Sequence, residues 1–140
     1  VLGPRVASAE AEVMSWILIV DDDDDVRALV ARKLERRGYE VTTAADGTGG
    51  LEALLAHRYD LAVVDWMMPG LDGLELCRAF RQSEFGDDTI IMLLTARAQE
   101  IDVQRGFASG VDEYVVKPFS PTDLADRIDA ARPPRFQGVR

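Results

Sequence analysis

The chain is short and acidic. It has 140 residues, of which 47% are hydrophobic, and a formal net charge of -9 at pH 7. This length is enough for one packed core and too short for two ordinary domains, so we expect a single domain. The acidic balance argues against a nucleic-acid-binding surface, because such a surface needs clustered Lys and Arg. There is also no Lys/Arg-rich amphipathic segment that would indicate binding to a membrane surface.

The two ends of the chain differ in character from its centre. Residues 1–13 lack both the basic start and the apolar run of a signal peptide, and Met14 would suit a natural start. We therefore expect an N-terminal extension or expression remnant over 1–13 and the domain over 14–132. Pro133 ends the last helical pattern, so 133–140 reads as a linker or fragment end.

Two features bear on the compartment. The longest apolar stretch near the start, Trp16 to Val20, is far shorter than the roughly 20 residues of a membrane-spanning helix and predicts a buried strand. The single cysteine, Cys77, cannot form an internal disulfide, which is typical of a reducing compartment. We therefore expect a cytoplasmic location.

Short apolar runs rich in β-branched residues alternate with helical patterns along the chain. The predicted strands are Trp16 to Val20, Glu40 to Thr43, Leu61 to Val64, Ile90 to Leu94 and Tyr114 to Val116. Strict alternation implies right-handed crossovers and a parallel sheet covered on both faces. The predicted fold class is α/β, with a doubly wound, flavodoxin-like, five-stranded sheet in the order 2-1-3-4-5.

Apolar residues at helical spacing predict five helices. They are marked by Val26, Leu29, Val30 and Leu34; by Leu51, Leu54 and Leu55; by Leu74, Cys77 and Phe80; more weakly by Ile101 with Arg105 to Phe107; and by Leu124 with Ile128. Gly38 suits the left-handed residue that ends the first helix. Ser120 can cap the fifth helix, and Pro121 suits its first position.

Five consecutive aspartates, Asp21 to Asp25, follow the first predicted strand. Residues 23–25 are interpreted as a solvated run that caps the next helix, since acidic side chains are favoured at a helix N-terminus. Asp21 and Asp22, at the end of the strand itself, are better placed to bind a cation. A calcium loop of the EF-hand type is excluded, because its sixth and twelfth positions would be Val26 and Arg32 instead of Gly and Glu.

A third acidic residue, Asp65, follows the predicted third strand. The first and third strands are neighbours in a doubly wound sheet, so Asp65 should meet Asp21 and Asp22 at the carboxyl edge. Apart from Lys117, only a metal ion would compensate these charges. Carboxylate oxygens suit a hard divalent ion, and we expect Mg²⁺.

Thr95 and Lys117 follow the fourth and fifth predicted strands and should reach the same edge. A hydroxyl donor and an ammonium group there could neutralise the oxygens of a phosphoryl group during its transfer. Taken singly, the Thr is equally consistent with a helix cap and the Lys with a solvated surface charge. The prediction depends on the convergence of both with the acidic residues.

Four segments resemble the motifs of bacterial response-regulator receiver domains, in the family's order and spacing. They are Ile17 to Asp22, Leu61 to Gly73 (LAVVDWMMPGLDG), Thr95 with Ala96, and Tyr114 to Phe119 (YVVKPF). The similarity runs from Trp16 to about Ala131 and is closest to the receivers of winged-helix transcription factors.

The resemblance implies a role for each matching residue. Asp65 would accept a phosphoryl group from a sensor histidine kinase, and Lys117 would bind that group. Asp21 and Asp22 would be the acidic pair of the Mg²⁺ site, with Asp65 and the carbonyl of Met67 as further ligands. Thr95 and Tyr114 would be the switch hydroxyl and the switch aromatic residue.

The resemblance also implies an output surface, made by the fourth helix, fifth strand and fifth helix. Related receivers dimerise there through charge pairs, and Asp112, Glu113 and Arg127 match part of that set. Val103 and Asp129 stand where basic residues are usual, so a dimer would be weakened or differently paired. DNA contact by this domain itself is not expected.

Two alternatives remain open at this point. Asp22, Asp24 and Val26 resemble the Asp-x-Asp-x-Val opening of haloacid-dehalogenase-type phosphohydrolases, in which Asp22 would be the nucleophile. That family also needs an acidic pair at a strand end after its lysine, whereas the later aspartates here lie on a predicted helix, and Asp65 stays unexplained. A purely structural pseudo-receiver is disfavoured, because no site residue is missing.

The lifetime of an aspartyl phosphate depends on how an attacking water is held. The residues two positions beyond Asp65 and Thr95, which are Met67 and Arg97, would flank its path. A Met side chain neither accepts a proton nor holds water by a strong hydrogen bond, so we expect slow loss of the phosphoryl group.

Overall fold

The structure is a computed structural model of the chain and describes residues 16–86, 89–96 and 107–131. The strands are β1 (Trp16–Val20), β2 (Glu40–Ala44), β3 (Leu61–Asp65), β4 (Ile90–Thr95) and β5 (Glu113–Val116), and the helices are α1 (Asp24–Arg36), α2 (Gly47–Ala56), α3 (Gly73–Arg81) and α5 (Pro121–Ala131). The expected fourth helix and both expected terminal segments lie outside the described residues, except that residues 107 and 108 are helical. No described helix has the length and apolar character needed to cross a bilayer.

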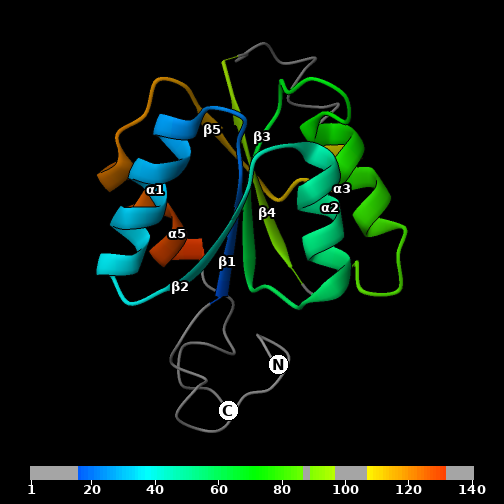
Figure 1. The fold of residues 1–140 in the computed structure, drawn as a ribbon, viewed down its shortest axis with the longest axis horizontal. Coiled ribbons are helices and arrows are strands. Elements are labelled where there is room, and N and C mark those ends of the chain that lie inside the picture. Colours follow the sequence, from blue (N-terminus) through cyan, green and yellow to red (C-terminus); the bar gives the residue numbers. More distant parts are fainter. Residues whose placement is uncertain (1–15, 87–88, 97–106, 132–140) are drawn as a thin grey trace, which may run out of the picture.

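All five strands are parallel and lie in the order β2-β1-β3-β4-β5. Helices α1 and α5 cover one face of the sheet, and α2 and α3 cover the other (Figure 1). The predicted fold class and strand order are confirmed. Four of the five strands are one residue longer than predicted, and β3 and β4 include the predicted site residues Asp65 and Thr95.

Two apolar clusters hold the layers together. One packs α2 and α3 against the sheet around Leu54, Leu76 and Phe80, and the other packs α1 and α5 around Leu34 and Ile128. Strands β1, β3 and β4 are buried on both faces, which explains why their sequences are continuous apolar runs instead of alternating ones. Packing on both faces therefore holds these three central strands, and with them the residues at their carboxyl ends, in place.

The helix ends follow the sequence signals. Asp23 caps α1 by accepting hydrogen bonds from the N–H groups of Asp25 and Val26, and Ser120 accepts one from Asp123 at the start of α5. Gly38 has φ +94°, the left-handed conformation that lets the chain turn from α1 into β2. These capping predictions are confirmed.

Candidate functional site

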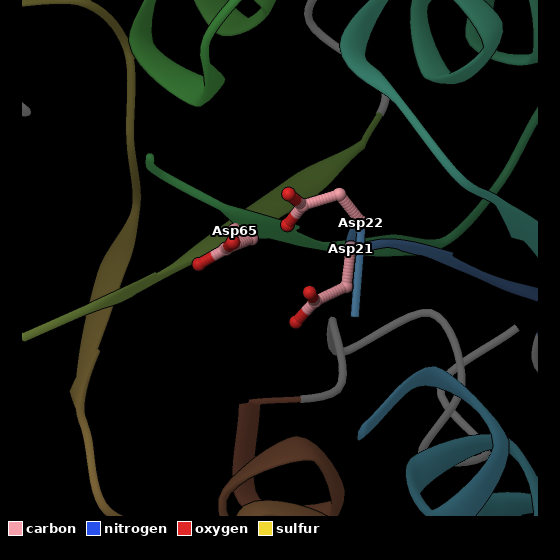
Figure 2. Close-up of side chains that lie close together, drawn as sticks. All are labelled: Asp21, Asp22 and Asp65. Carbon is pink, nitrogen blue, oxygen red and sulfur yellow. The ribbon is translucent and has the colours of Figure 1, made fainter. Parts of the chain in front are cut away.

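Three carboxylates meet at the carboxyl edge of the sheet. Asp21 follows β1 directly and Asp65 ends β3, and these strands are neighbours, with Val20 opposite Val64. Each of Asp21, Asp22 and Asp65 offers a carboxylate oxygen, and these oxygens lie within 4.8 Å of one another (Figure 2). The juxtaposition expected from parallel strand ends is therefore present.

Hydrogen bonds hold the backbone N–H, the backbone carbonyl and one carboxylate oxygen of Asp21. Its N–H donates to the carbonyl of Ala44 at 3.2 Å, and its Oδ1 accepts from the N–H of Asp23 at 2.9 Å. Its own carbonyl accepts from Nη1 of Arg27 at 2.7 Å. The remaining oxygen, Oδ2, is buried and accepts no hydrogen bond from any described residue. Such an atom is costly to bury unless a ligand satisfies it.

Lys117 reaches the acidic cluster from the first position after β5. Its Nζ donates to Oδ1 of Asp65 at 2.8 Å. Its backbone N–H donates to the carbonyl of Thr95 at 2.8 Å, which anchors it beside the end of β4. The fifth-strand cation thus contacts the third-strand carboxylate, as the sequence predicted.

Burial dominates the electrostatics of this cluster. Desolvation raises the pKa of Asp65, although the hydrogen bond from Lys117 opposes the shift, and Asp21 adds repulsion. Desolvation likewise raises the pKa of Asp21, against the hydrogen bond from Asp23 and the charge of Lys117. Burial alone would lower the pKa of Lys117, but the neighbouring carboxylates outweigh it and the pKa is raised. The cluster therefore favours an additional positive charge.

The donor set fits a hard divalent cation. Three carboxylates supply oxygen ligands, and Oδ2 of Asp21 is a buried acceptor with no described partner. Mg²⁺ prefers such oxygen ligands and commonly keeps several waters, so three carboxylates at one open edge suit it. The resemblance to receiver domains likewise implies Mg²⁺ at an acidic cluster of this kind.

The remaining predicted site residues lie around this edge in different environments. Thr95 is buried at the end of β4, whereas Met67 is 58% exposed. The Tyr114 ring packs edge-on against Phe107, with ring centroids 5.3 Å apart, and lies 6.4 Å from the ring of Trp66. Tyr114 therefore connects the core beside Asp65 with the described end of the fourth helix region. Arg97 and Val103 lie outside the described residues.

Gly73 has a closer relationship to the site than its sequence context indicated. A Cβ atom at this position would lie 2.5 Å from the carbonyl oxygen of Asp65 and 2.9 Å from Cα of Trp66. The Gly73 N–H donates to the carbonyl of Trp66 at 2.8 Å, and Asp72 with Glu75 forms a capping box there. The structure thus shows that α3 begins in close backbone contact with the candidate acceptor.

An apolar groove of about 500 Å³ opens beside Lys117. Its walls come from α1, through Val26 and Leu29, and from the segment after β5, through Pro118 and Phe119. Leu29 was predicted from helical spacing, yet it is 56% exposed because it faces this groove and not the core.

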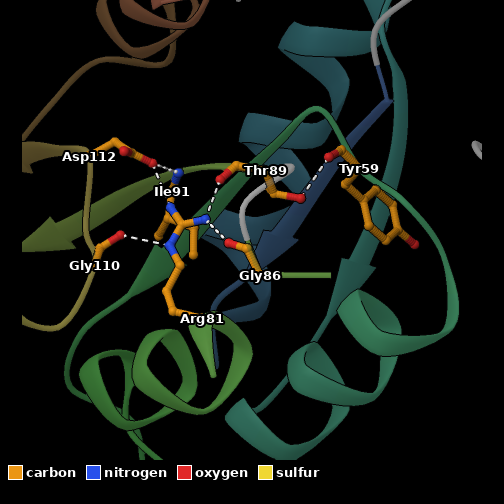
Figure 3. Close-up of polar contacts among 7 residues, drawn as sticks. All are labelled: Tyr59, Arg81, Gly86, Thr89, Ile91, Gly110 and Asp112. Carbon is orange, nitrogen blue, oxygen red and sulfur yellow. Dashed lines mark hydrogen bonds and ion pairs between the residues drawn. The ribbon is translucent and has the colours of Figure 1, made fainter. Parts of the chain in front are cut away.

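Arg81 forms a polar network at the opposite, amino-terminal edge of the sheet (Figure 3). Its guanidinium donates to the carbonyls of Gly86 (2.5 Å), Thr89 (2.7 Å) and Gly110 (3.0 Å). It also pairs with Asp112 at 2.7 Å, whose carboxylate accepts from the N–H of Ile91 at 2.7 Å. Asp112, expected from the resemblance to pair between molecules, is thus engaged within the chain.

The other expected interface charges also have partners within the chain. Arg127 donates to Glu113 at 2.8 Å and to the carbonyl of Tyr114 at 2.8 Å. Asp129 pairs with Arg37 at 2.7 Å and accepts from the hydroxyl of Tyr39. The sequence did not predict these pairs, because each joins residues on different elements.

The chain was compared with known proteins. The sequence profile of the response regulator receiver domain matches residues 17–129. The transcriptional regulatory protein AfsQ1 of Streptomyces coelicolor is 46% identical over 117 residues, covering 84% of this chain and 51% of that protein. ResD of Bacillus subtilis is 41% identical over 114 residues, covering 81% and 46%. The chain spans about half the length of these curated relatives.

Solved structures give the same result. The chemotaxis response regulator CheY4 of Vibrio cholerae has a TM-score of 0.80 at 35% identity, covering 84% of this chain and 98% of that one. TrrA of Thermotoga maritima, solved in complex with Mg²⁺ and BeF, has a TM-score of 0.73 at 36% identity with the same coverage. These matches support the receiver interpretation and give no support to the haloacid-dehalogenase alternative. The chain belongs to the response regulator receiver domain family.

Proposed function

We propose that this domain takes a phosphoryl group from the phosphohistidine of a sensor histidine kinase onto Asp65 and passes the event on through its surface. The observation that carries the proposal is the convergence of three carboxylates, one with an unsatisfied buried oxygen, with Lys117 at 2.8 Å from Asp65. The likeness to TrrA supports it, because that receiver was solved with Mg²⁺ and BeF.

The proposed reaction transfers the phosphoryl group without net redox change. An oxygen of Asp65 attacks phosphorus, the P–N bond of the donor breaks, and the electron pair of that bond returns to the imidazole. Lys117 neutralises phosphoryl oxygens once it exchanges its contact with Asp65, and Thr95 donates its hydroxyl to another. Bound Mg²⁺ would be held by Asp21, Asp22, Asp65 and the carbonyl of Met67, and it supplies charge neutralisation.

The same residues would govern loss of the phosphoryl group, since hydrolysis needs a water in line with the bond to Asp65. The domain would thus catalyse both its own phosphorylation and its own dephosphorylation. The apolar groove beside Lys117 offers the donor protein a contact surface at the reactive edge. A donor protein bound in this groove would place its histidine at the same edge of the sheet as Asp65.

The proposed output begins at Thr95. On phosphorylation its hydroxyl moves toward the phosphoryl group, Tyr114 follows, and the face made by the fourth helix, β5 and α5 changes. The contact between the rings of Tyr114 and Phe107 supports this route, because it joins β5 to the end of the fourth helix region. A phosphorylation-dependent homodimer through Asp112, Glu113 and Arg127 would require these residues to exchange their present partners.

Phosphorylation of the Asp65→Asn variant tests the acceptor. The variant should lose all acid-labile labelling by acetyl phosphate or a phosphohistidine donor while keeping its circular dichroism spectrum, because only the nucleophile is removed. The exposed residue Asp25 provides a matched control, so Asp25→Asn should label normally. Stoichiometric labelling of folded Asp65→Asn, or mapping of the label to Asp22, would overturn the assignment. Excess chelator should also abolish labelling of the wild-type chain.

Sedimentation tests the proposed homodimer. The domain should sediment as a monomer when unmodified and as a dimer with the phosphoryl mimic beryllofluoride. A monomer under both conditions would count against dimerisation as the output.

A further inference from the structure

Arg27 holds the metal-site loop in a way that neither the sequence motifs nor the comparisons assign. It lies one turn into α1, and its side chain is only 18% exposed although the helix start around it is solvated. One arm of its guanidinium donates to the carbonyl of Asp21 at 2.7 Å, and the other pairs with Asp24. The planar fork therefore bridges the end of β1 and the first turn of α1.

This bridge completes the immobilisation of Asp21. Its N–H and Oδ1 are held by Ala44 and Asp23, and Arg27 fixes its carbonyl. That carbonyl belongs to the peptide group that links Asp21 to Asp22, so its orientation also fixes the position of the Asp22 backbone nitrogen. The oxygen left over, Oδ2 of Asp21, is the buried acceptor that faces no described donor.

We propose that Arg27 is a positioning residue for the divalent cation: by holding the Asp21 carbonyl it orients the carboxylates of Asp21 and Asp22 toward Asp65. This inference rests on the proposed metal site. Residues that orient ligands from behind in this way typically change metal affinity by about 10- to 100-fold when they are removed.

If Arg27 acted only through its charge, its removal would change Mg²⁺ affinity in the opposite direction. If Arg27 were only a nearby positive charge, its removal would relieve repulsion of a divalent cation and tighten binding. If Arg27 positions the ligands, its removal weakens binding even though the site becomes more negative. The two roles are therefore separated by the direction of the change in Mg²⁺ affinity.

The experiment is a titration of the unphosphorylated chain with MgCl₂, followed through the backbone amide signals of Asp22, Asp23 and Trp66 by NMR. Arg27→Met keeps the length of the side chain and should weaken Mg²⁺ binding about tenfold. Arg32→Met removes an exposed positive charge further along α1, and its Kd should stay within about twofold of the wild-type value. Asp24→Asn breaks the exposed ion pair but leaves the bond to Asp21, so binding should again change less than about twofold.

Each outcome decides the role of Arg27. Equal or tighter binding by Arg27→Met would overturn it while leaving the metal site in place. No binding by the wild-type chain would overturn the proposed metal site and the role of Arg27 together. If Arg27→Met does not fold, Arg27→Lys decides, because a lysine keeps the charge but its flexible ammonium group holds the Asp21 carbonyl less rigidly than the planar guanidinium does. Binding weakened severalfold supports the positioning role, and unchanged binding rejects it.

Discussion

Nζ of Lys117 lies 2.8 Å from Oδ1 of Asp65, although 52 residues separate them in the sequence. The pair does not balance the site, because Asp21 and Asp22 bring two more carboxylates to the same edge. The pKa of Asp65 is raised by burial in spite of the lysine. Without a cation, the folded domain therefore holds carboxylates in a place that disfavours their charge.

This imbalance predicts a pH-dependent stability difference between the wild type and Asp21→Asn. The pKa of Asp21 is raised in the folded state above its ordinary 3.8, so the unfolded chain loses this proton first as pH rises. The contribution of Asp21 is thus most favourable below pH 3.8 and is lost as pH rises through the folded-state pKa. The variant should be more stable by about 1 kcal/mol at pH 7.5 without Mg²⁺, and the gap should close in acid.

Urea denaturation at several pH values without divalent ions checks this prediction. Asp25→Asn is the control for removing a solvated carboxylate nearby, in the first turn of α1, and its stability should differ little from that of the wild type. A constant stability difference between wild type and Asp21→Asn at all pH values would contradict the assigned cause.

Addition of Mg²⁺ should reverse that order of stability. A ligand that binds only the folded state, at 100 times its Kd, adds about 2.7 kcal/mol to the free energy of unfolding. The wild-type chain should gain this amount, and Asp21→Asn should gain much less at the same concentration, because it lacks the buried acceptor oxygen. Thermal unfolding with MgCl₂ and with KCl at matched ionic strength measures both gains. Equal gains in the two proteins would exclude Asp21 as a ligand.

Gly73→Ala should both destabilise the fold and slow phosphorylation of the proposed acceptor, Asp65. The new methyl group would lie 2.5 Å from the carbonyl oxygen of Asp65 and 2.9 Å from Cα of Trp66, and both of these are backbone atoms. Such overpacking costs about 1–3 kcal/mol, and phosphorylation should slow because β3 must shift. Gly70→Ala is a useful comparison, since its φ of +76° is strained but its Cβ meets open space. Phosphorylation of folded Gly73→Ala at the wild-type rate would refute the coupling.

Arg81→Met should destabilise the amino-terminal edge of the sheet. The substitution removes the guanidinium from which three carbonyls and the Asp112 carboxylate accept hydrogen bonds, so we expect a loss of about 2–4 kcal/mol in the free energy of unfolding. Arg78→Met on the same helix removes, within the described part of the chain, one side-chain hydrogen bond of 3.2 Å to Ser109 and should cost far less. Chemical denaturation compares the two variants. Hydrogen exchange should show the largest change around Gly110 and Ile91, and uniform change across the sheet would argue against a local anchor.

Met67→Asn should shorten the lifetime of the aspartyl phosphate. Met67 is 58% exposed two residues after Asp65, so a side chain there has access to water at the site. An amide can hold the attacking water by a hydrogen bond, whereas a thioether cannot do so strongly. Phosphoryl loss in excess Mg²⁺ should be faster in the variant than in the parent. Equal or slower loss would mean that Met67 has no part in setting the lifetime.

The sequence predicted the fold and the centre of the site because both depend on short-range signals. Apolar runs marked each strand, and a parallel sheet necessarily brings the residues after those strands to one edge. Asp21, Asp65 and Lys117 therefore followed from strand assignment and chain order. The capping roles of Asp23 and Ser120 were also readable from residue type and position.

Contacts that depend on tertiary geometry could not be predicted in this way. Arg27 showed a visible signal, its spacing of three residues from Asp24, but its bond to the Asp21 carbonyl depends on how the loop folds back. The four partners of Arg81 come from loops whose approach no periodicity encodes. The engagement of Glu113 by Arg127 likewise required the packing of α5 beside β5.

The Arg81 network has a consequence for how the protein can change over time. Its contacts lie at the edge of the sheet opposite Asp65, and β4 and β5 both run from that edge to the site, from Ile91 to Thr95 and from Asp112 to Lys117. The amino-terminal edge is thus held by the Arg81 network, whereas residues at the carboxyl edge can change during evolution without loss of that network. Libraries that vary the groove residues Val26, Leu29 and Phe119 should yield folded domains with altered partner choice, because these substitutions leave the Arg81 network intact.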